Sequence, residues 1–130
     1  MIKSTIDVDG YWKVILFVNV DYNRFDVIES ALTDILAPIK VIDRIYDKIS
    51  YEYDSGVTFT NSDYRTSVVC INKATSREEL INTISHEADH VQNAICEYYD
   101  VPLDSEDAAY LIGYLVSKFY KHSARLFCWY

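Results

Sequence analysis

The sequence predicts an α+β protein in which a mixed or antiparallel sheet of three to five strands packs against two long helices. Short β-branched segments separated by turn residues fill the N-terminal half, whereas residues 76–99 and 104–122 have helical periodicity. A chain of 130 residues, half of them apolar and a quarter charged, can bury an ordinary core and is typical of one globular domain. We therefore expect a single domain over residues 1–130.

A β-hairpin is expected near the N-terminus. Residues 6–8 and 11–20 are separated by Asp9-Gly10, a dipeptide that supplies the positive φ angles of a tight hairpin turn. Residues 14–18 are apolar without strict alternation, which is typical of a strand covered on both faces. The second arm of the hairpin is therefore predicted to be a central strand.

Two helices and several extended segments follow the hairpin. Asn23 is a candidate N-cap for a helix over residues 24–36, which Pro38 would end. Residues 41–49 fit helical spacing although their β-branched content also favours a strand, and we interpret them as a short helix. Extended segments are expected at residues 51–53, 57–60 and 65–72.

Composition narrows the class of protein and its partners. Cys70, Cys96 and Cys128 are widely spaced and include no Cys-x-x-Cys pair, so we expect buried thiols. A net charge of −8 without a local Lys/Arg cluster argues against direct binding of nucleic acid. The apolar stretches are too short to span a membrane and the N-terminus has no signal-peptide pattern, so a cytoplasmic protein is expected.

The strongest functional signal is a His-Glu-x-x-His motif formed by His86, Glu87 and His90. It lies in the predicted helix over residues 76–99, which a capping box beginning at Ser76 would start. Histidines at positions i and i+4 lie one above the other on a helix, so both rings can converge on one metal ion. Glu87 would lie beside the ion and take a proton from the water that the metal activates. The motif therefore predicts a catalytic Zn²⁺ site.

A third protein ligand is expected, because catalytic zinc usually has three. Glu106 lies in the first turn of the last predicted helix, and the intervening chain is long enough to bring it back to the ion. Glu106, Tyr110 and Gly113 share one helix face by their spacing, and a glycine there would let the two helices approach closely. The alternatives to Glu106 as third ligand are Asp104, Asp107 and Glu97.

The His-Glu-x-x-His helix, followed by Glu106-x-x-x-Tyr110-x-x-Gly113, resembles the zincin metallopeptidases, and within them the gluzincin branch, whose third ligand is a glutamate. It is also similar to small, single-domain peptidase-like proteins carried by phages and mobile elements, in which a Glu-x-x-x-Tyr-x-x-Gly pattern follows the same motif. The resemblance covers about residues 85–115. The N-terminal half resembles no family that we can name.

The resemblance implies a zincin-like domain that holds Zn²⁺ with His86, His90 and Glu106. Glu87 would be the general base and would later donate a proton to the leaving amine. Full-size gluzincins also have a separate histidine or tyrosine that stabilises the oxyanion. The candidates for that role here are Tyr110 and His122.

The resemblance also indicates the kind of substrate. In such folds the strand before the metal helix often binds an extended peptide, which points to residues 65–72 as the edge strand and to a peptide or protein as the substrate. We therefore expect a zinc-dependent hydrolase that cleaves peptide bonds. Because the chain lacks an evident second lobe, the alternative is a zinc-containing binding or regulatory module that uses the zincin scaffold without catalytic turnover.

Overall fold

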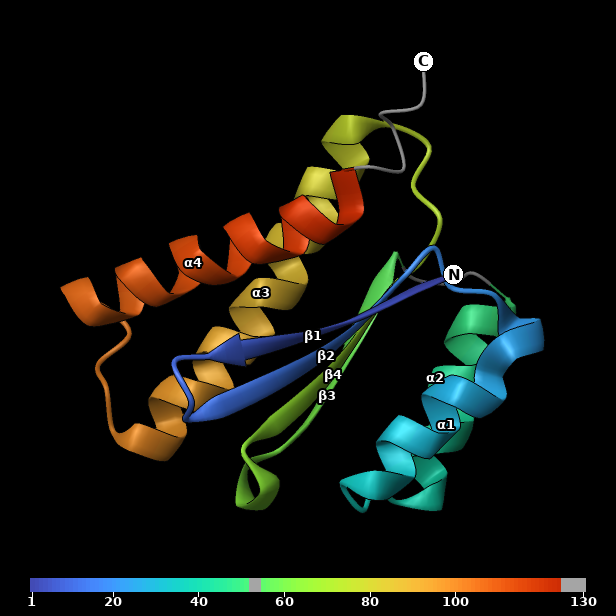
Figure 1. Ribbon diagram of the computed structural model, residues 1–130, viewed down its shortest axis with the longest axis horizontal. Coiled ribbons are helices and arrows are strands. Elements are labelled where there is room, and N and C mark those ends of the chain that lie inside the picture. The colour runs from blue at the N-terminus through green and yellow to red at the C-terminus, as the bar shows by residue number, and fades with distance from the viewer. Residues whose placement is uncertain (52–54, 125–130) are drawn as a thin grey trace.

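The computed structural model describes residues 1–51 and 55–124 and confirms the predicted α+β class. A four-stranded sheet of order β1-β2-β4-β3 lies between two pairs of helices, with α1 and α2 on one face and α3 and α4 on the other (Figure 1). The strands are β1 (Ile2–Val8), β2 (Trp12–Val18), β3 (Gly56–Asn61) and β4 (Thr66–Ile71), and the α-helices are α1 (Phe25–Asp34), α2 (Ile39–Ser50), α3 (Arg77–Tyr99) and α4 (Glu106–Ser123).

The sheet is mixed. Strand β2 pairs antiparallel with β1 and parallel with β4, and β3 pairs antiparallel with β4. The β1–β2 hairpin is confirmed, because Asp9 and Gly10 take positive φ angles of 49° and 79°, as a tight primed turn requires. The prediction of β2 as a central strand is also confirmed.

One expectation about the sheet was wrong. The predicted strand at residues 65–72 exists as β4, but it lies inside the sheet between β2 and β3. The edge strands of the sheet are β1 and β3, and β3 is the one that contacts α3. The reason is that both edges of β4 are paired. One edge pairs with β2 in the parallel direction, and the other pairs with β3 in the antiparallel direction. A strand order of this kind depends on pairings far apart in the sequence.

Side-chain caps fix where the helices begin. The Ser76 hydroxyl accepts a hydrogen bond from the backbone N–H of Glu79 at 3.1 Å, as the predicted capping box requires. Ser105 caps α4 in the same way. The expectation of Asn23 as a cap was wrong, because the Asp21 carboxylate accepts the Asn23 N–H at 3.0 Å and caps a short 3₁₀ turn before α1. The predicted helix over residues 41–49 is confirmed as α2.

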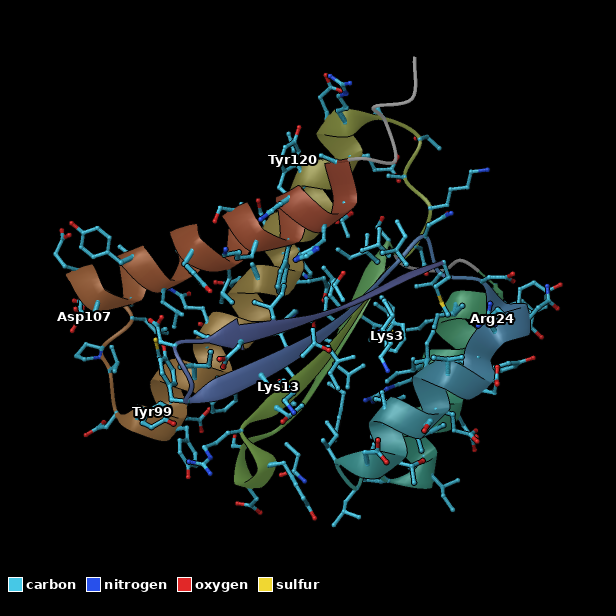
Figure 2. The ribbon with its side chains drawn as sticks, in the orientation of Figure 1. Lys3, Lys13, Arg24, Tyr99, Asp107 and Tyr120 are labelled. Carbon is cyan, nitrogen blue, oxygen red and sulfur yellow. The ribbon has the colours of Figure 1, made fainter. Side chains whose placement is uncertain are left out.

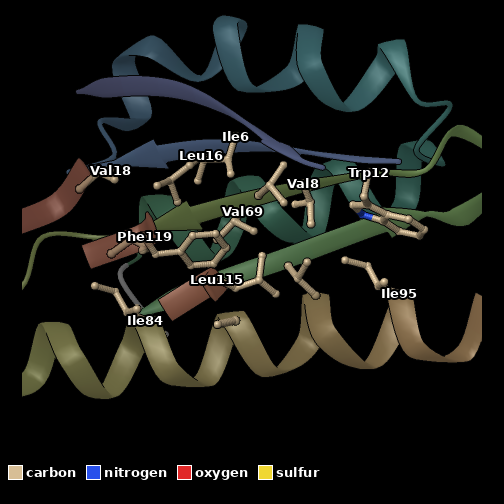
Figure 3. Packing of buried hydrophobic residues seen from close by; sticks show 14 of the residues in the cluster. Ile6, Val8, Trp12, Leu16, Val18, Val69, Ile84, Ile95, Leu115 and Phe119 are labelled. Carbon is tan, nitrogen blue, oxygen red and sulfur yellow. The ribbon is translucent and has the colours of Figure 1, made fainter. Parts of the chain in front are cut away.

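The main core lies between the sheet and the α3–α4 pair (Figure 3). Leu115 and Phe119 of α4 are fully buried there. Trp12 donates from its indole nitrogen to the Ser67 hydroxyl at 3.1 Å, which satisfies a polar group inside this core. A second cluster, which includes Phe17, fills the space between the sheet and the α1–α2 pair.

Two further expectations concern the cysteines and membrane association. Cys70 and Cys96 are buried free thiols, as predicted, and Cys128 lies outside the described residues. Over the part of the chain that the structure describes, no helix is both long and apolar enough to cross a membrane.

The position of Phe119 leads to a test of the core. Phe119→Ala should lower the free energy of unfolding by about 3–5 kcal/mol, because it removes a fully buried ring and leaves a cavity. Its neighbour Tyr120 is exposed, so Tyr120→Ala should change the stability by less than about 1 kcal/mol. Chemical denaturation followed by circular dichroism measures both. Equal losses in the two variants would contradict the described packing of α4.

Candidate functional site

The rotation of α3 about its own axis decides which side chains reach solvent. Leu80, Ile84, Val91 and Ile95 are buried against the sheet at helical spacing. This stripe turns the flank that carries His86, Glu87 and His90 toward β3 and away from α4. The predicted motif therefore lies at the border between the core and an open cleft.

The cleft has a volume of about 430 Å³ and lies between α3 and α2, with β3 along its floor. Helix α3 supplies both histidines and Glu87, and α2 supplies the opposite wall. The side chains and backbone that line it are those of Val41, Arg44, Ile45, Lys48, Ser55, Gly56, Val57, Thr58, Phe59, Asn82, Thr83, His86, Glu87 and His90. Because β3 is the last strand of the sheet on this side, its outer edge borders the cleft.

The two histidine rings converge as the motif predicts. The Nε2 atoms of His86 and His90 are 3.2 Å apart, and the ring planes are inclined by 84°. Two nitrogen ligands at about 2.0–2.1 Å from a tetrahedral zinc ion would lie about 3.3 Å apart. The same distance also suits a hydrogen bond between two neutral rings. This pair of donors therefore fits a metal ion without any movement of the helix.

Glu87 is held beside the histidines in a nearly closed environment. Its side chain is only 3% exposed, and Oε1 accepts a hydrogen bond from the Thr58 hydroxyl at 2.8 Å. Oε2 lies against Gly56, where an added Cβ would come within 3.0 Å of it. The strand thus orients the carboxylate through one hydroxyl and makes room for it through one glycine.

The buried Cys70 thiol is close enough to this carboxylate to feel its charge. Burial raises the pKa of the Cys70 thiol to about 12, and the charge of Glu87 adds to this effect. A thiol with such a pKa stays protonated at neutral pH, and only the thiolate is a strong nucleophile. The burial and the raised pKa of the thiol therefore argue against Cys70 as a nucleophile.

The structure does not bring Glu106 or Tyr110 to the histidines. Both side chains are exposed on the outer face of α4, and Tyr110 is 75% exposed. The expected close approach at Gly113 is also wrong, because a Cβ there would meet nothing within 4 Å. The physical reason is that α4 packs against the opposite flank of α3, where Gln92 donates to the backbone carbonyl of Ala108 at 2.7 Å.

The alternative third ligands do not join the pair either. Figure 2 shows Asp107 at the N-terminal end of α4, on the far side of the sheet from Arg24 and the α1–α2 layer. The exposed side chains Asp104, Asp107 and Glu97 do not line the cleft, nor does His122. Within residues 1–51 and 55–124, no three His, Cys, Asp or Glu side chains are grouped so that they could hold one metal ion. Among the described residues, only the two histidines of the predicted ligand set are therefore brought together.

Sequence reasoning missed several residues of the cleft. Gly56 was not singled out from the sequence, although it leaves space for Glu87. Thr58 and Gly56 lie on the same face of β3, so strand alternation could have grouped them. Arg44 and Lys48 share one face of α2 by their spacing of four residues. No local signal, however, indicated that α2 would face α3 across the edge of the sheet.

The space around Gly56 can be tested by substitution. Gly56→Ala should lower the free energy of unfolding by about 1–3 kcal/mol, because its Cβ would lie 3.0 Å from the Cys70 carbonyl, Glu87 and Thr83 at once. This cost exceeds the gain of about 0.4–1 kcal/mol from a less flexible unfolded chain. Gly113→Ala is the matched control and should stabilise the protein by about 0.5–1 kcal/mol, since it removes a glycine from an open position in a helix. A stabilised Gly56→Ala protein in thermal unfolding would contradict the described contact.

Known proteins assign no family to this arrangement. No protein-family model, curated protein or solved structure shows significant similarity to the chain. The case for a function therefore depends on the geometry of the cleft and on the motif that it contains.

Proposed function

We propose that this protein is a zinc-dependent hydrolase of the zincin type that cleaves peptide bonds. The observation that carries the proposal is the pair of converging histidines, with Nε2 atoms 3.2 Å apart, next to a buried and hydrogen-bonded glutamate in an open cleft. This combination of residue types and spacing is that of a His-Glu-x-x-His metal site.

His86 and His90 would hold the ion through Nε2. Zinc bound there would polarise a substrate carbonyl and lower the pKa of a coordinated water toward neutrality. Glu87 lines the same cleft and could take the proton from the attacking water and deliver it to the leaving nitrogen. The Thr58 hydroxyl would keep the carboxylate in the orientation that this transfer needs.

The edge of the sheet supports a peptide as the substrate. Strand β3 pairs with β4 on one side only, so its outer edge could form main-chain hydrogen bonds with an extended chain. A peptide added there would run between α2 and α3 and pass directly beside the histidines. In this proposal β3 takes the role that was first expected for residues 65–72.

A second candidate function is a zinc-containing binding module without turnover. It is favoured by one observation, namely that among the described residues no third candidate ligand is grouped with His86 and His90. Catalytic zinc sites usually have three protein ligands. The same cleft would then bind a peptide or a partner segment without cleaving it.

Metal content tests whether the two histidines, and not Glu106, are needed for zinc binding. Protein incubated with zinc and then desalted should retain about one zinc per chain, and His86→Ala or His90→Ala should lose it. Glu106→Ala should retain it, because Glu106 is exposed on the outer face of α4. Elemental analysis of the four proteins gives the answer. Loss of zinc in Glu106→Ala would mean that α4 moves to complete the site, and retention in both histidine variants would overturn the proposed ligands.

Glu87→Gln separates catalysis from binding. The amide keeps the shape of the carboxylate, so zinc content should stay as in the wild type while cleavage of a peptide mixture falls by about 10²–10⁴-fold. Mass spectrometry of the products measures the rate. Undiminished cleavage by Glu87→Gln would refute the role of Glu87. Zinc retention without any cleavage by the wild type would favour the binding module.

A further inference from the structure

The wall of the cleft opposite the histidines is cationic. Arg44 and Lys48 lie four residues apart on α2, which places them on one face of the helix, and both line the cleft. Arg44 is exposed and Lys48 is half-buried. Neither residue is part of the His-Glu-x-x-His motif or of the proposed zinc chemistry.

This wall differs in sign from the protein as a whole. The chain carries a net charge of −8, yet the charged residues described along the cleft, histidines aside, are Arg44, Lys48 and Glu87. Glu87 is 3% exposed and directed toward Thr58. A ligand that enters between α2 and α3 would therefore meet the exposed Arg44 guanidinium on the α2 side, which favours an anionic group.

Arg44 does not anchor α2 to the core. The residues that anchor α2 to the second core are Ile45 and Ile49, which are 2% and 3% exposed. The Arg44 side chain instead is exposed and lines the cleft. A guanidinium presents a planar set of donors that matches a carboxylate in a bidentate arrangement.

We propose that Arg44 recognises acidic side chains of an extended peptide bound along β3. The inference rests on the proposed function, since it assigns a substrate class to the same cleft. In β3 itself, Thr58 points toward α3 and bonds to Glu87, whereas Val57 and Phe59 pack into the second core on the α2 side. A peptide paired to β3 would alternate in the same way, so every second side chain would face Arg44. The preferred substrate therefore carries Asp or Glu at one or two alternate positions.

The test uses a binding readout that does not need cleavage. Zinc-treated Glu87→Gln protein, immobilised, is exposed to a library of random ten-residue peptides, and the retained peptides are sequenced by mass spectrometry. Asp and Glu should be enriched about fivefold among them, as expected for ion pairs near the surface. Arg44→Glu in the same background should abolish this enrichment. Arg24→Glu makes the same change of charge at an exposed site outside the cleft and should retain it.

The cleavage of the same library by the wild-type protein distinguishes the two proposals. Retained or cleaved peptides without acidic enrichment, or enrichment that persists in Arg44→Glu, would overturn the inference about Arg44 and leave the hydrolase proposal standing if cleavage occurs. If no peptide is retained, acidic enrichment among the cleaved peptides that depends on Arg44 would support the inference. A library that is neither bound nor cleaved would overturn both proposals.

Discussion

The packing of α3 on the sheet is the constraint on which the whole site depends. The buried stripe from Leu80 to Ile95 fixes the rotation of the helix, and this rotation in turn directs Glu87 to Thr58 and leaves both histidines in the cleft. Burying a carboxylate at 3% exposure is costly unless it has a partner. The Thr58 hydroxyl and the space at Gly56 meet that requirement. The strand and the helix are therefore matched at this one contact.

The same packing explains the position of α4. Because α4 covers the flank of α3 opposite the cleft, its contact at Gln92 and its own buried residues Leu115 and Phe119 direct Glu106 outward. The opposite side of the cleft is instead formed by α2, which belongs to the other layer of the fold. The proposed active site thus lies at the edge of the sheet, where one helix from each layer meets β3.

Features that depend on neighbouring residues could be predicted from the sequence, whereas those that depend on contacts between distant segments could not. Asp9-Gly10 and Ser76 act within a few residues, so the hairpin and the start of α3 could be derived from them. Helical spacing also placed His86 and His90 together. Spacing alone does not state in which direction a helix face points, and for this reason Glu106 was assigned to the wrong side of α3. The roles of β3 and β4 were exchanged for a related reason, because strand order is set by pairing across the whole chain.

The parallel pairing of β2 with β4 has a consequence for how the protein folds. The hydrogen bond from Trp12 to Ser67 spans 55 residues, so the chain that carries α1, α2 and β3 must be closed into a long loop when the centre of the sheet forms. Contacts of such long range carry a high cost in loop entropy and form late. The β1–β2 hairpin needs only a two-residue turn and can form early. The cleft is formed by α2 and β3, which lie within this loop, and by α3, which follows it. We therefore expect the cleft to be among the last parts of the molecule to form.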